Sequence, residues 1–387
     1  MVVETRQLDR LTSPGRQLSI SDLPEIVEQL SPEEKERFNI QYEARTTIGH
    51  LTFPEQMKAK LPQLLGPDVS LEEASNQLLT FIQDRFIKEE AVYNLLRSRR
   101  PRTTTTESLF KKAIVEKKDD CSFCDPENST PVNGSARIRK GKVISSGNLT
   151  PFADYHELLI FNHDPYEIEW ETFSDIMDCA IEMINYQYLK DPTIKNFELI
   201  MNFGFKAGAS IPHGHAQVLG FRGSMHRFIV EHYNAMANIY KSVYQQDFWE
   251  DKFKIHQSLG LGWNTGEDVW TLATLTPKKN RGLTIFDNIS NRFGVSTEFK
   301  NTFYQSLRFM FDEEAVEEFN FALLFPPFGR NDDYWKNSRN FVIFVDRGSS
   351  RTPTNDMGAM EAITGLVVVE QDPFRWGTKL GKYLQAA

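Results

Sequence analysis

The residues best suited to chemistry lie in one polar segment, Asn202 to Val218, which reads NFGFKAGASIPHGHAQV. A strand is predicted from Pro212 to Phe221. It would direct His213, His215 and Gln217 to one face, because strand side chains alternate with a period of two. Three nitrogen-bearing side chains on one face are costly to bury unless a neighbour or a ligand satisfies them. The pattern therefore predicts a binding or reaction site on this strand.

The loop before this strand is rich in small residues, among them Gly204, Gly208 and Ser210. Glycine lets the backbone come close to a ligand, and backbone N–H groups together with a serine hydroxyl can hold phosphate oxygens. A neutral imidazole beside such a loop suits phosphoryl chemistry, because the surrounding donors reduce the charge repulsion at phosphorus. An H-x-H pair taken alone more often has a structural or metal-chelating role, so the functional prediction depends on the loop and on Gln217.

Nine positions of the segment, in order, resemble the histidine-triad superfamily, and specifically its branch of galactose-1-phosphate uridylyltransferases and related nucleotide phosphorylases. That branch carries N-x-G-x-x-A-G-A-S-x-x-H-x-H-x-Q, which is matched here by Asn202, Gly204, Ala207, Gly208, Ala209, Ser210, His213, His215 and Gln217. The resemblance implies that His215 is the nucleophile that forms a covalent nucleotidyl-histidine. It also implies that Gln217 and Ser210 hold the transferred phosphate and that Asn202 and the loop glycines contact the substrate.

Gln217 stands where the hydrolase branch of the superfamily has a third histidine. An amide can donate a hydrogen bond but cannot deliver or take a proton, so it suits transfer between phosphates better than activation of water. The predicted reaction transfers a nucleoside monophosphate from a nucleotide sugar or a dinucleoside polyphosphate to phosphate or a sugar 1-phosphate. Three alternatives stay open: a histidine-triad-like nucleotide hydrolase, a zinc-braced module that binds nucleotides without turnover, and a metallohydrolase.

A second group of residues predicts a metal site. Cys121 and Cys124 form a C-x-x-C pair whose thiolates can hold one Zn²⁺, and two further ligands are needed. The resemblance implies that His163 and His213 complete a structural zinc site that braces the strand of the nucleophile. His156 is a competing ligand, and two reduced thiols without a metal are the alternative.

Other polar residues give weaker predictions. Asn148 begins NLTP, which resembles the superfamily's N-x-x-P turn, where the asparagine helps to hold the nucleotide. An ordinary Asn/Pro turn explains it equally well. Arg347 and Arg351, directly after a predicted strand, could clamp a second phosphate, because guanidinium binds phosphate bidentately. These arginines, like the basic loop 278–281, are individually more typical of a solvated surface.

The elements around these residues predict an α+β chain. Residues 1–118 indicate a mainly helical N-terminal segment, with capping boxes at Ser31 and Ser70 and a helix over the apolar positions 78–87. Residues 119–250 alternate strands and helices, and residues 251–387 repeat that order, which suggests tandem duplication. The resemblance implies two histidine-triad-like halves, each an antiparallel sheet plus helix. The second half lacks H-x-H and is therefore degenerate.

The boundaries of these elements follow from hydrophobic period and turn residues. The predicted strands are 143–146, 157–162, 197–203, 212–221, 270–276, 283–287, 319–325, 340–346 and 363–369. The predicted helices of the two halves are 173–190, 224–245 and 297–316.

Composition excludes several classes of partner. The net charge of −9 argues against nucleic acid, whose binding relies on Lys and Arg. The locally basic stretch 97–118 is either a solvated linker or a surface near an anionic substrate. No apolar run of about eighteen residues predicts a membrane span, and Met1 to Arg10 do not resemble a secretory signal. Three cysteines fit a reducing compartment. We therefore expect a cytoplasmic protein, and the resemblance allows a homodimer.

Overall fold

The structure is a computed structural model, and it describes residues 17–134, 137–266, 268–289, 294–329, 332–354 and 356–386. The stretch Met1 to Arg10, in which no secretory signal is predicted, lies outside the described residues. Within these ranges, no helix combines the length and the apolar character that a membrane span needs.

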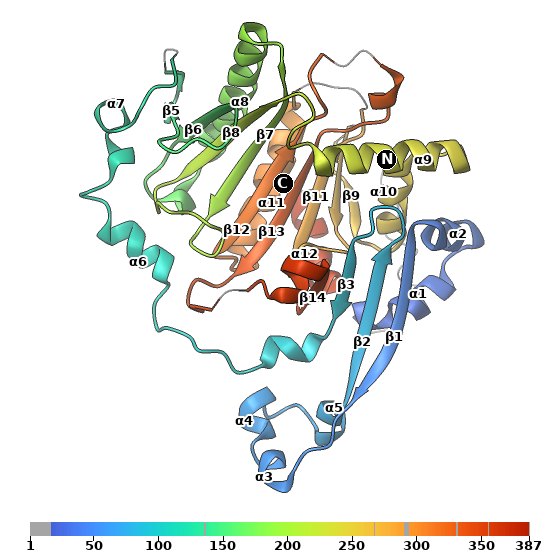
Figure 1. Cartoon of the computed structure of the whole chain (residues 1–387). Coiled ribbons are helices and arrows are strands. Elements are labelled where there is room, and N and C mark those ends of the chain that lie inside the picture. The colour runs from blue at the N-terminus through green and yellow to red at the C-terminus, as the bar shows by residue number, and fades with distance from the viewer. Residues whose placement is uncertain are drawn as a thin grey trace.

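A ten-stranded sheet forms the centre of the molecule, and every neighbouring pair of strands in it is antiparallel (Figure 1). The strand order is β4-β5-β6-β8-β7-β12-β13-β11-β10-β9. These strands are β4 (Arg139–Lys140), β5 (Val143–Gly147), β6 (Tyr155–Ile160), β7 (Ile194–Phe203), β8 (His215–Arg222), β9 (Gly262–Asn264), β10 (Val269–Ala273), β11 (Gly282–Asp287), β12 (Glu318–Leu324) and β13 (Phe341–Gly348).

The sheet order is the same when it is read inward from either edge. The series β4-β5-β6-β8-β7 of the first half corresponds to β9-β10-β11-β13-β12 of the second. Each half has one long helix after its third strand, α8 (Trp170–Lys190) and α11 (Thr297–Asp312). The halves meet at β7 and β12, where Asn202 lies opposite Asn320. The predicted α+β architecture of two antiparallel-sheet-plus-helix halves is therefore confirmed.

Helices α8 and α11 pack on one face of the sheet, and α12 (Pro373–Ala386) packs against α11. The buried residues of α8 recur every three or four positions, among them Phe173, Ile176, Ala180 and Ile184. This spacing gives the helix one apolar stripe that faces the strands. Burial of each Ile or Phe of such a stripe stabilises the fold by about 1.5–3 kcal/mol. The periodicity of the sequence thus determines which side of the helix meets the sheet.

The opposite face of the sheet is covered at both ends. Over the second half, α9 (Phe228–Tyr244) and α10 (Phe248–Ser258) pack an aromatic cluster against β10, β11 and β13. Over the first half, Phe123 packs against Leu158 and Ile160 of β6. Between these covers lie partly exposed side chains from β8, β7, β12 and β13, which we call the open strip. Its residues are Ile200, Asn202, His215, Asn320, Ala322 and Ile343.

The N-terminal segment is mainly helical, as predicted. Its helices are α1 (Leu23–Gln29), α2 (Pro32–Gln41), α3 (Glu55–Lys58), α4 (Leu61–Leu65), α5 (Leu71–Ser75) and α6 (Leu109–Glu116). The capping box predicted at Ser31 is present, because Ser31 Oγ accepts the Glu34 N–H and the Glu34 carboxylate accepts the Ser31 N–H. At the second predicted cap, Ser70 Oγ accepts the Glu73 N–H and begins α5.

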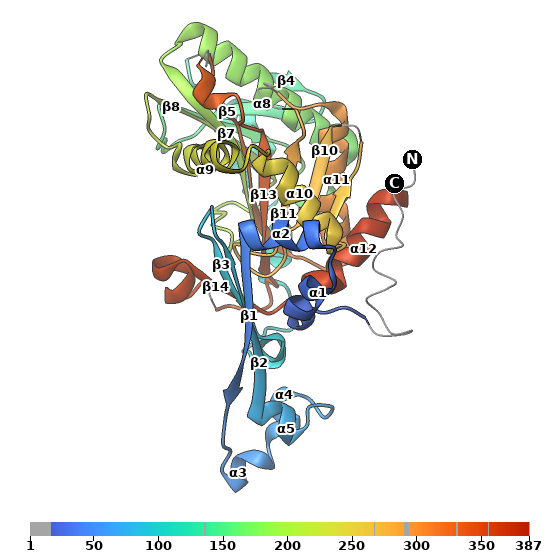
Figure 2. The same ribbon diagram turned by 90° about the vertical axis from the view of Figure 1, so that its right-hand side faces the viewer.

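One predicted helix in this segment is wrong. Positions 78–87 lie largely in a strand, β2 (Asn76–Asp84), which pairs with β1 (Tyr42–His50); β3 (Glu90–Tyr93) and β14 (Leu366–Val369) complete a sheet of order β1-β2-β3-β14. Long-range pairing overrode the helix-like spacing, since Thr80 and Ile82 are both buried with the strand's period of two. Figure 2 shows the β1–β2 hairpin projecting away from the main sheet, with α3, α4 and α5 at its far end.

A buried ion pair attaches this hairpin to the second half of the chain. Lys252 of α10 donates to Asp84 Oδ2 at 2.6 Å and to Tyr42 Oη at 2.7 Å, and the two charged side chains are 1% and 0% exposed. Such a pair offsets the cost of burying its charges only while both partners are present. The parallel pairing of β14 with β3 also joins the C-terminal region to the N-terminal segment. The division of the chain at 118 and 250 stays a prediction.

The remaining differences concern element boundaries. The strand expected from Pro212 begins instead at His215, because proline has no N–H to donate to a ladder. His213 therefore belongs to the preceding turn. The sequence did not predict α10 or α12, and the strand expected over 363–369 is shorter and lies in the second sheet.

Candidate active site and metal centre

The glycine loop joins β7 to β8 and is held at its base by a carboxylate. Glu318 Oε2 accepts the Lys206 N–H at 2.7 Å, and the Ala209 N–H donates to Gly204 O at 3.0 Å. Gly204 has a φ of +96°, and a Cβ there would lie 2.7 Å from Glu318 Cδ. Both the backbone conformation and the approach of Glu318 therefore require glycine at this position.

His215 is the first residue of β8 and lies on the open strip. Its Nδ1 is 2.9 Å from His213 O, and a carbonyl can only accept, so Nδ1 carries the proton and Nε2 carries the free lone pair. Burial lowers the pKa of His215, which keeps the ring neutral at physiological pH. The ring is thus fixed in the tautomer whose Nε2 can act as a base or as a nucleophile.

Gln217 lies two residues further along the same face of β8, beside His156 of β6. The Phe152 N–H donates to His156 Nδ1 at 3.4 Å, and His156 Nε2 lies 2.9 Å from Gln217 Oε1. Asn148 Nδ2 lies 3.1 Å from the same ring nitrogen, and Asn148 Oδ1 accepts the Thr150 N–H at 2.8 Å. The structure therefore brings Asn148 and Gln217 together through His156.

Asn202 ends the row of polar side chains on β7. It lies two residues beyond Ile200, which is opposite Gln217 of β8, so Asn202 is on the strip beside His215. Its Oδ1 accepts the Asn320 Nδ2–H at 2.8 Å. Two amides, Asn202 and Gln217, thus flank His215.

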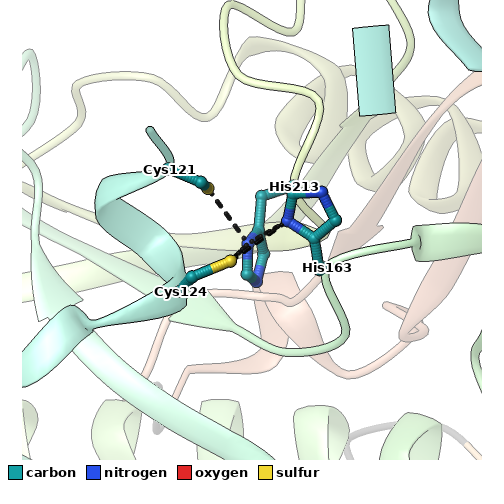
Figure 3. A group of neighbouring side chains, drawn as sticks. All are labelled: Cys121, Cys124, His163 and His213. Carbon is teal, nitrogen blue, oxygen red and sulfur yellow. Dashed lines mark hydrogen bonds between the residues drawn. The ribbon is translucent and has the colours of Figure 1, made fainter. Parts of the chain in front are cut away.

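The four residues predicted as metal ligands lie together (Figure 3). Cys121 Sγ is 3.3 Å from His213 Nδ1, and Cys124 Sγ is 3.2 Å from His163 Nδ1 and 3.6 Å from His213 Nδ1. The two Nδ1 atoms are 3.2 Å apart. All four ligand atoms lie within 4.8 Å of one another, whereas His156 bonds Gln217 instead. This group could hold one metal ion.

The outer hydrogen bonds of both histidines support a cation between them. His163 Nε2 lies 2.8 Å from Ile114 O, and His213 Nε2 lies 2.8 Å from Phe161 O. Each Nε2 must therefore carry the proton, and the two Nδ1 lone pairs point at each other and at the sulfur atoms. Such a meeting of lone pairs is unfavourable unless a cation lies at its centre, and a carbonyl behind each imidazole is the usual second shell of a metal-bound histidine.

Close packing joins the cluster of two cysteines and two histidines to His215. The ring of Phe123, between the two cysteines, contacts the His215 ring edge-on with centroids 5.3 Å apart, and the His213 ring at 5.9 Å. Gly214 separates the two histidines and exchanges backbone hydrogen bonds with Phe161 and Asn162 at the end of β6. A shift of the cluster would therefore move the His215 ring.

The remaining predicted residues differ in exposure and in their partners. Gly208 and Ser210 are exposed in the glycine loop. Arg347 is 9% exposed, and it bonds both carboxylate oxygens of Asp356. Arg351 lies at the surface, with Nε 4.0 Å from a carboxylate oxygen of Glu317.

Cations of the two basic stretches are likewise engaged by carboxylates of this chain. The pairs are Arg97, Arg100 and Arg102 with Glu370, Lys278 with Glu89, Lys279 with Glu361, and Arg281 with Glu314 and Asp346. Much of the positive charge of these stretches is therefore compensated within the fold.

Three residues of the site were missed from the sequence: Phe123, Glu318 and Asn320. Glu318 and Asn320 did leave a signal, because they are polar residues with a period of two at the start of an apolar strand, EFNFALL. Phe123 left no signal in the sequence, since an aromatic residue between two cysteines is not part of a recognisable pattern.

Neither a family model nor a curated protein sequence matches this chain. Solved structures resemble it in fold. An ADP-glucose phosphorylase from Arabidopsis thaliana, solved with bound ADP-glucose, is 14% identical with a TM-score of 0.60, over 79% of this chain and 98% of that chain. A GalT-like protein from Arabidopsis thaliana is 14% identical with a TM-score of 0.57 over the same shares. A uridylyltransferase is 12% identical with a TM-score of 0.52, over 67% of this chain and 89% of that chain.

These structures define the class of fold to which the chain corresponds, that of the GalT-like uridylyltransferases and phosphorylases. The resemblance predicted from the segment Asn202 to Gln217 is therefore confirmed at the level of architecture.

Proposed function

We propose that the protein transfers a nucleoside monophosphate in two steps, with His215 as the nucleophile. The observation on which this proposal depends is the protonation and the position of the His215 ring. Its Nδ1–H is held by His213 O, so Nε2 has the free lone pair, and the ring lies on the open strip beside the glycine loop. A neutral imidazole with one fixed N–H is the form that a nucleophile needs. The likeness in fold to a phosphorylase that binds ADP-glucose supports a nucleotide as the substrate.

The first step forms a covalent intermediate. Nε2 attacks the α-phosphorus of the donor, a nitrogen–phosphorus bond forms, and the bond to the leaving phosphate or sugar phosphate breaks with its electron pair on the leaving oxygen. Donation from Nδ1–H to His213 O stabilises the positive charge that develops on the ring. The amide groups of Gln217 and Asn202 would bond the non-bridging phosphate oxygens.

The second step reverses the first on a new acceptor. An oxygen of phosphate or of a sugar 1-phosphate attacks the same phosphorus, and the electron pair of the nitrogen–phosphorus bond returns to Nε2. Gln217 favours this acceptor over water, because an amide cannot take the proton that an attacking water must lose. Gly204, Gly208 and Ser210 would hold phosphate oxygens, and Asn148 would contact the nucleoside. Arg351 would meet a second phosphate.

We propose zinc as the ion held by Cys121, Cys124, His163 and His213. Tetrahedral Zn²⁺ with ligands at about 2.3 Å for sulfur and about 2.0 Å for nitrogen sets sulfur and nitrogen about 3.5 Å apart and two nitrogens about 3.3 Å apart. Four separations of 3.2–3.6 Å support this assignment: Cys121 to His213, Cys124 to His163, Cys124 to His213, and His163 to His213. With four protein ligands the ion is structural, and its binding would brace the turn that leads into β8.

The test is covalent labelling with α-phosphate-labelled nucleotide sugars of each base. We expect label on the protein that is labile in acid and stable in base, as a nitrogen–phosphorus bond is, and none on His215→Gln. The variant His50→Gln, at an exposed histidine of the β1–β2 hairpin, is expected to label like the parent.

The same assay separates the other hypotheses. Release of the monophosphate only after phosphate or a sugar 1-phosphate is added supports transfer. Steady release from donor alone would instead identify a hydrolase, and binding without any label would identify a binding module. Either result would overturn the proposal.

A further inference from the structure

The amide of Asn320, in the second half, has only one orientation. Its Nδ2 donates to Asn202 Oδ1 at 2.8 Å and to Ala207 O at 2.8 Å. The carbonyl of Ala207 can only accept a hydrogen bond, so the atom that faces it must be the amide nitrogen. Asn320 therefore contacts both Asn202 and the backbone of the glycine loop as a donor.

Arg347 fixes the other end of the same amide. Its Nη1 donates to Asn320 Oδ1 at 2.8 Å, while Nε and Nη2 donate to the two carboxylate oxygens of Asp356 at 2.9 and 2.7 Å. A guanidinium has no acceptor, so Asn320 cannot turn its nitrogen toward Arg347 without losing a hydrogen bond. Asp356 compensates the buried charge and holds the planar guanidinium in place.

These contacts set the polarity of Asn202. Because Asn202 Oδ1 is engaged by Asn320, its amide nitrogen is the group left beside the glycine loop, and a Cβ on Gly208 would lie 3.9 Å from Asn202 Nδ2. An N–H at this position attracts a phosphate oxygen. An amide oxygen at the same position would repel it.

We propose that Arg347 and Asn320 are positioning residues, which orient Asn202 so that it presents N–H donors to the phosphate of the substrate. This inference rests on the proposed function of the same site. It gives the degenerate half a part in the reaction: strand β12 supplies the residue that fixes a phosphate donor of β7, and strand β13 supplies the residue that prevents its reversal.

Two substitutions of Asn320 distinguish this role from simple packing. In Asn320→Asp an oxygen replaces the nitrogen that faces Asn202, so the Asn202 amide must rotate and turn its oxygen to the phosphate. In Asn320→Ala the Asn202 amide is free to adopt either orientation. We expect the single-turnover rate of His215 labelling to fall about 100-fold or more in Asn320→Asp and about 10-fold in Asn320→Ala.

A role limited to filling space and pairing with Arg347 predicts the opposite order. Aspartate has the shape of asparagine and forms a charged pair with Arg347, whereas alanine leaves a cavity. An Asn320→Asp rate equal to or above that of Asn320→Ala would therefore overturn the inference. Asn39→Asp, at an exposed position of α2, controls for the change in the net charge of the protein. Thermal unfolding and metal content, measured on each variant, confirm that the comparison is between folded proteins.

Failure of this inference is separable from failure of the proposed function. If the parent protein forms no labelled intermediate, the proposed function fails. The orientation is then tested by the affinity for ADP and UDP, measured by calorimetry. Weaker binding by Asn320→Asp than by Asn320→Ala supports the inference, and the reverse order overturns it.

Discussion

Replacement of Gly214 by alanine tests whether one close contact holds both the proposed metal cluster and His215, the proposed nucleophile. Gly214 lies between His213 and His215, and its N–H donates to Asn162 O at 3.1 Å. A Cβ at this position would lie 2.7 Å from Asn162 O and 2.8 Å from Phe161 Cδ2. Since ordinary contacts are about 3.5 Å, the two segments must separate by about 0.8 Å, and Phe161 Cε2, which would lie closer still, must also move.

The size of the effect follows from that displacement. Overpacking of this degree costs about 1–3 kcal/mol of stability. Misplacement of a reactive group by about 1 Å can cost about 100-fold in rate, so we expect Gly214→Ala to label His215 about 10- to 100-fold more slowly. His213 precedes the substituted residue and His163 follows Asn162, so we also expect metal affinity to fall by about 10-fold or more.

The assay combines single-turnover labelling with elemental analysis of metal per chain. The matched control is Gly49→Ala in β1, where an added Cβ makes ordinary contacts of 3.7 and 3.8 Å. It is expected to keep the parent's rate and metal content. If Gly214→Ala also labels at the parent's rate and retains its metal, the proposed coupling between the cluster and the nucleophile is refuted.

Other parts of the structure give three further predictions. Cys124→Ala is expected to lose the bound metal and to unfold at lower temperature. Cys179→Ala, in the core and outside the cluster, is expected to keep the metal. Equal metal content in the two variants would contradict the proposed metal site. Lys252→Met leaves Asp84 buried without its cation and is expected to cost about 3–5 kcal/mol in denaturant unfolding, a cost reduced when Asp84→Asn is combined with it. Burial raises the pKa of Glu157 to about 7 from 4.5. Between pH 4.5 and about 7 the folded state therefore binds a proton that the unfolded state has lost, so the free energy of unfolding falls as pH rises through this range. Glu157→Gln is expected to remove this fall and to exceed the parent's stability at pH 8 by at most about 3 kcal/mol, with no such gain at pH 4.

The sequence by itself determined the candidate active-site segment and the long elements beside it. The spacing of His213, His215 and Gln217 after a glycine-rich loop indicated the chemistry, because the period of a strand and the needs of a phosphate leave few residue types at these positions. The apolar stripes of α8 and α11 could be predicted for a similar reason, since a helix of this length must turn one apolar face to the sheet. These features depend on residues that lie close together in the sequence.

Features that depend on distant neighbours were decided only by the tertiary structure. The apolar residues of β2 have helix-like spacing in the sequence, but β2 pairs with β1 along its whole length, and this pairing determines the strand. In the same way, the sequence offered Arg347 as a candidate phosphate contact, but it did not indicate that Asp356 and Asn320 engage this side chain.

The site shows the same division. The sequence indicated His215 and the ligand types of the metal cluster, because those chemistries need particular residues at particular spacings. Which nitrogen of His215 is free, and which end of the Asn202 amide faces the loop, depend on carbonyl and amide groups that the turn before β8 and strand β12 supply. Hydrogen-bond polarity is a property of pairs in space, and only the folded chain brings those pairs together.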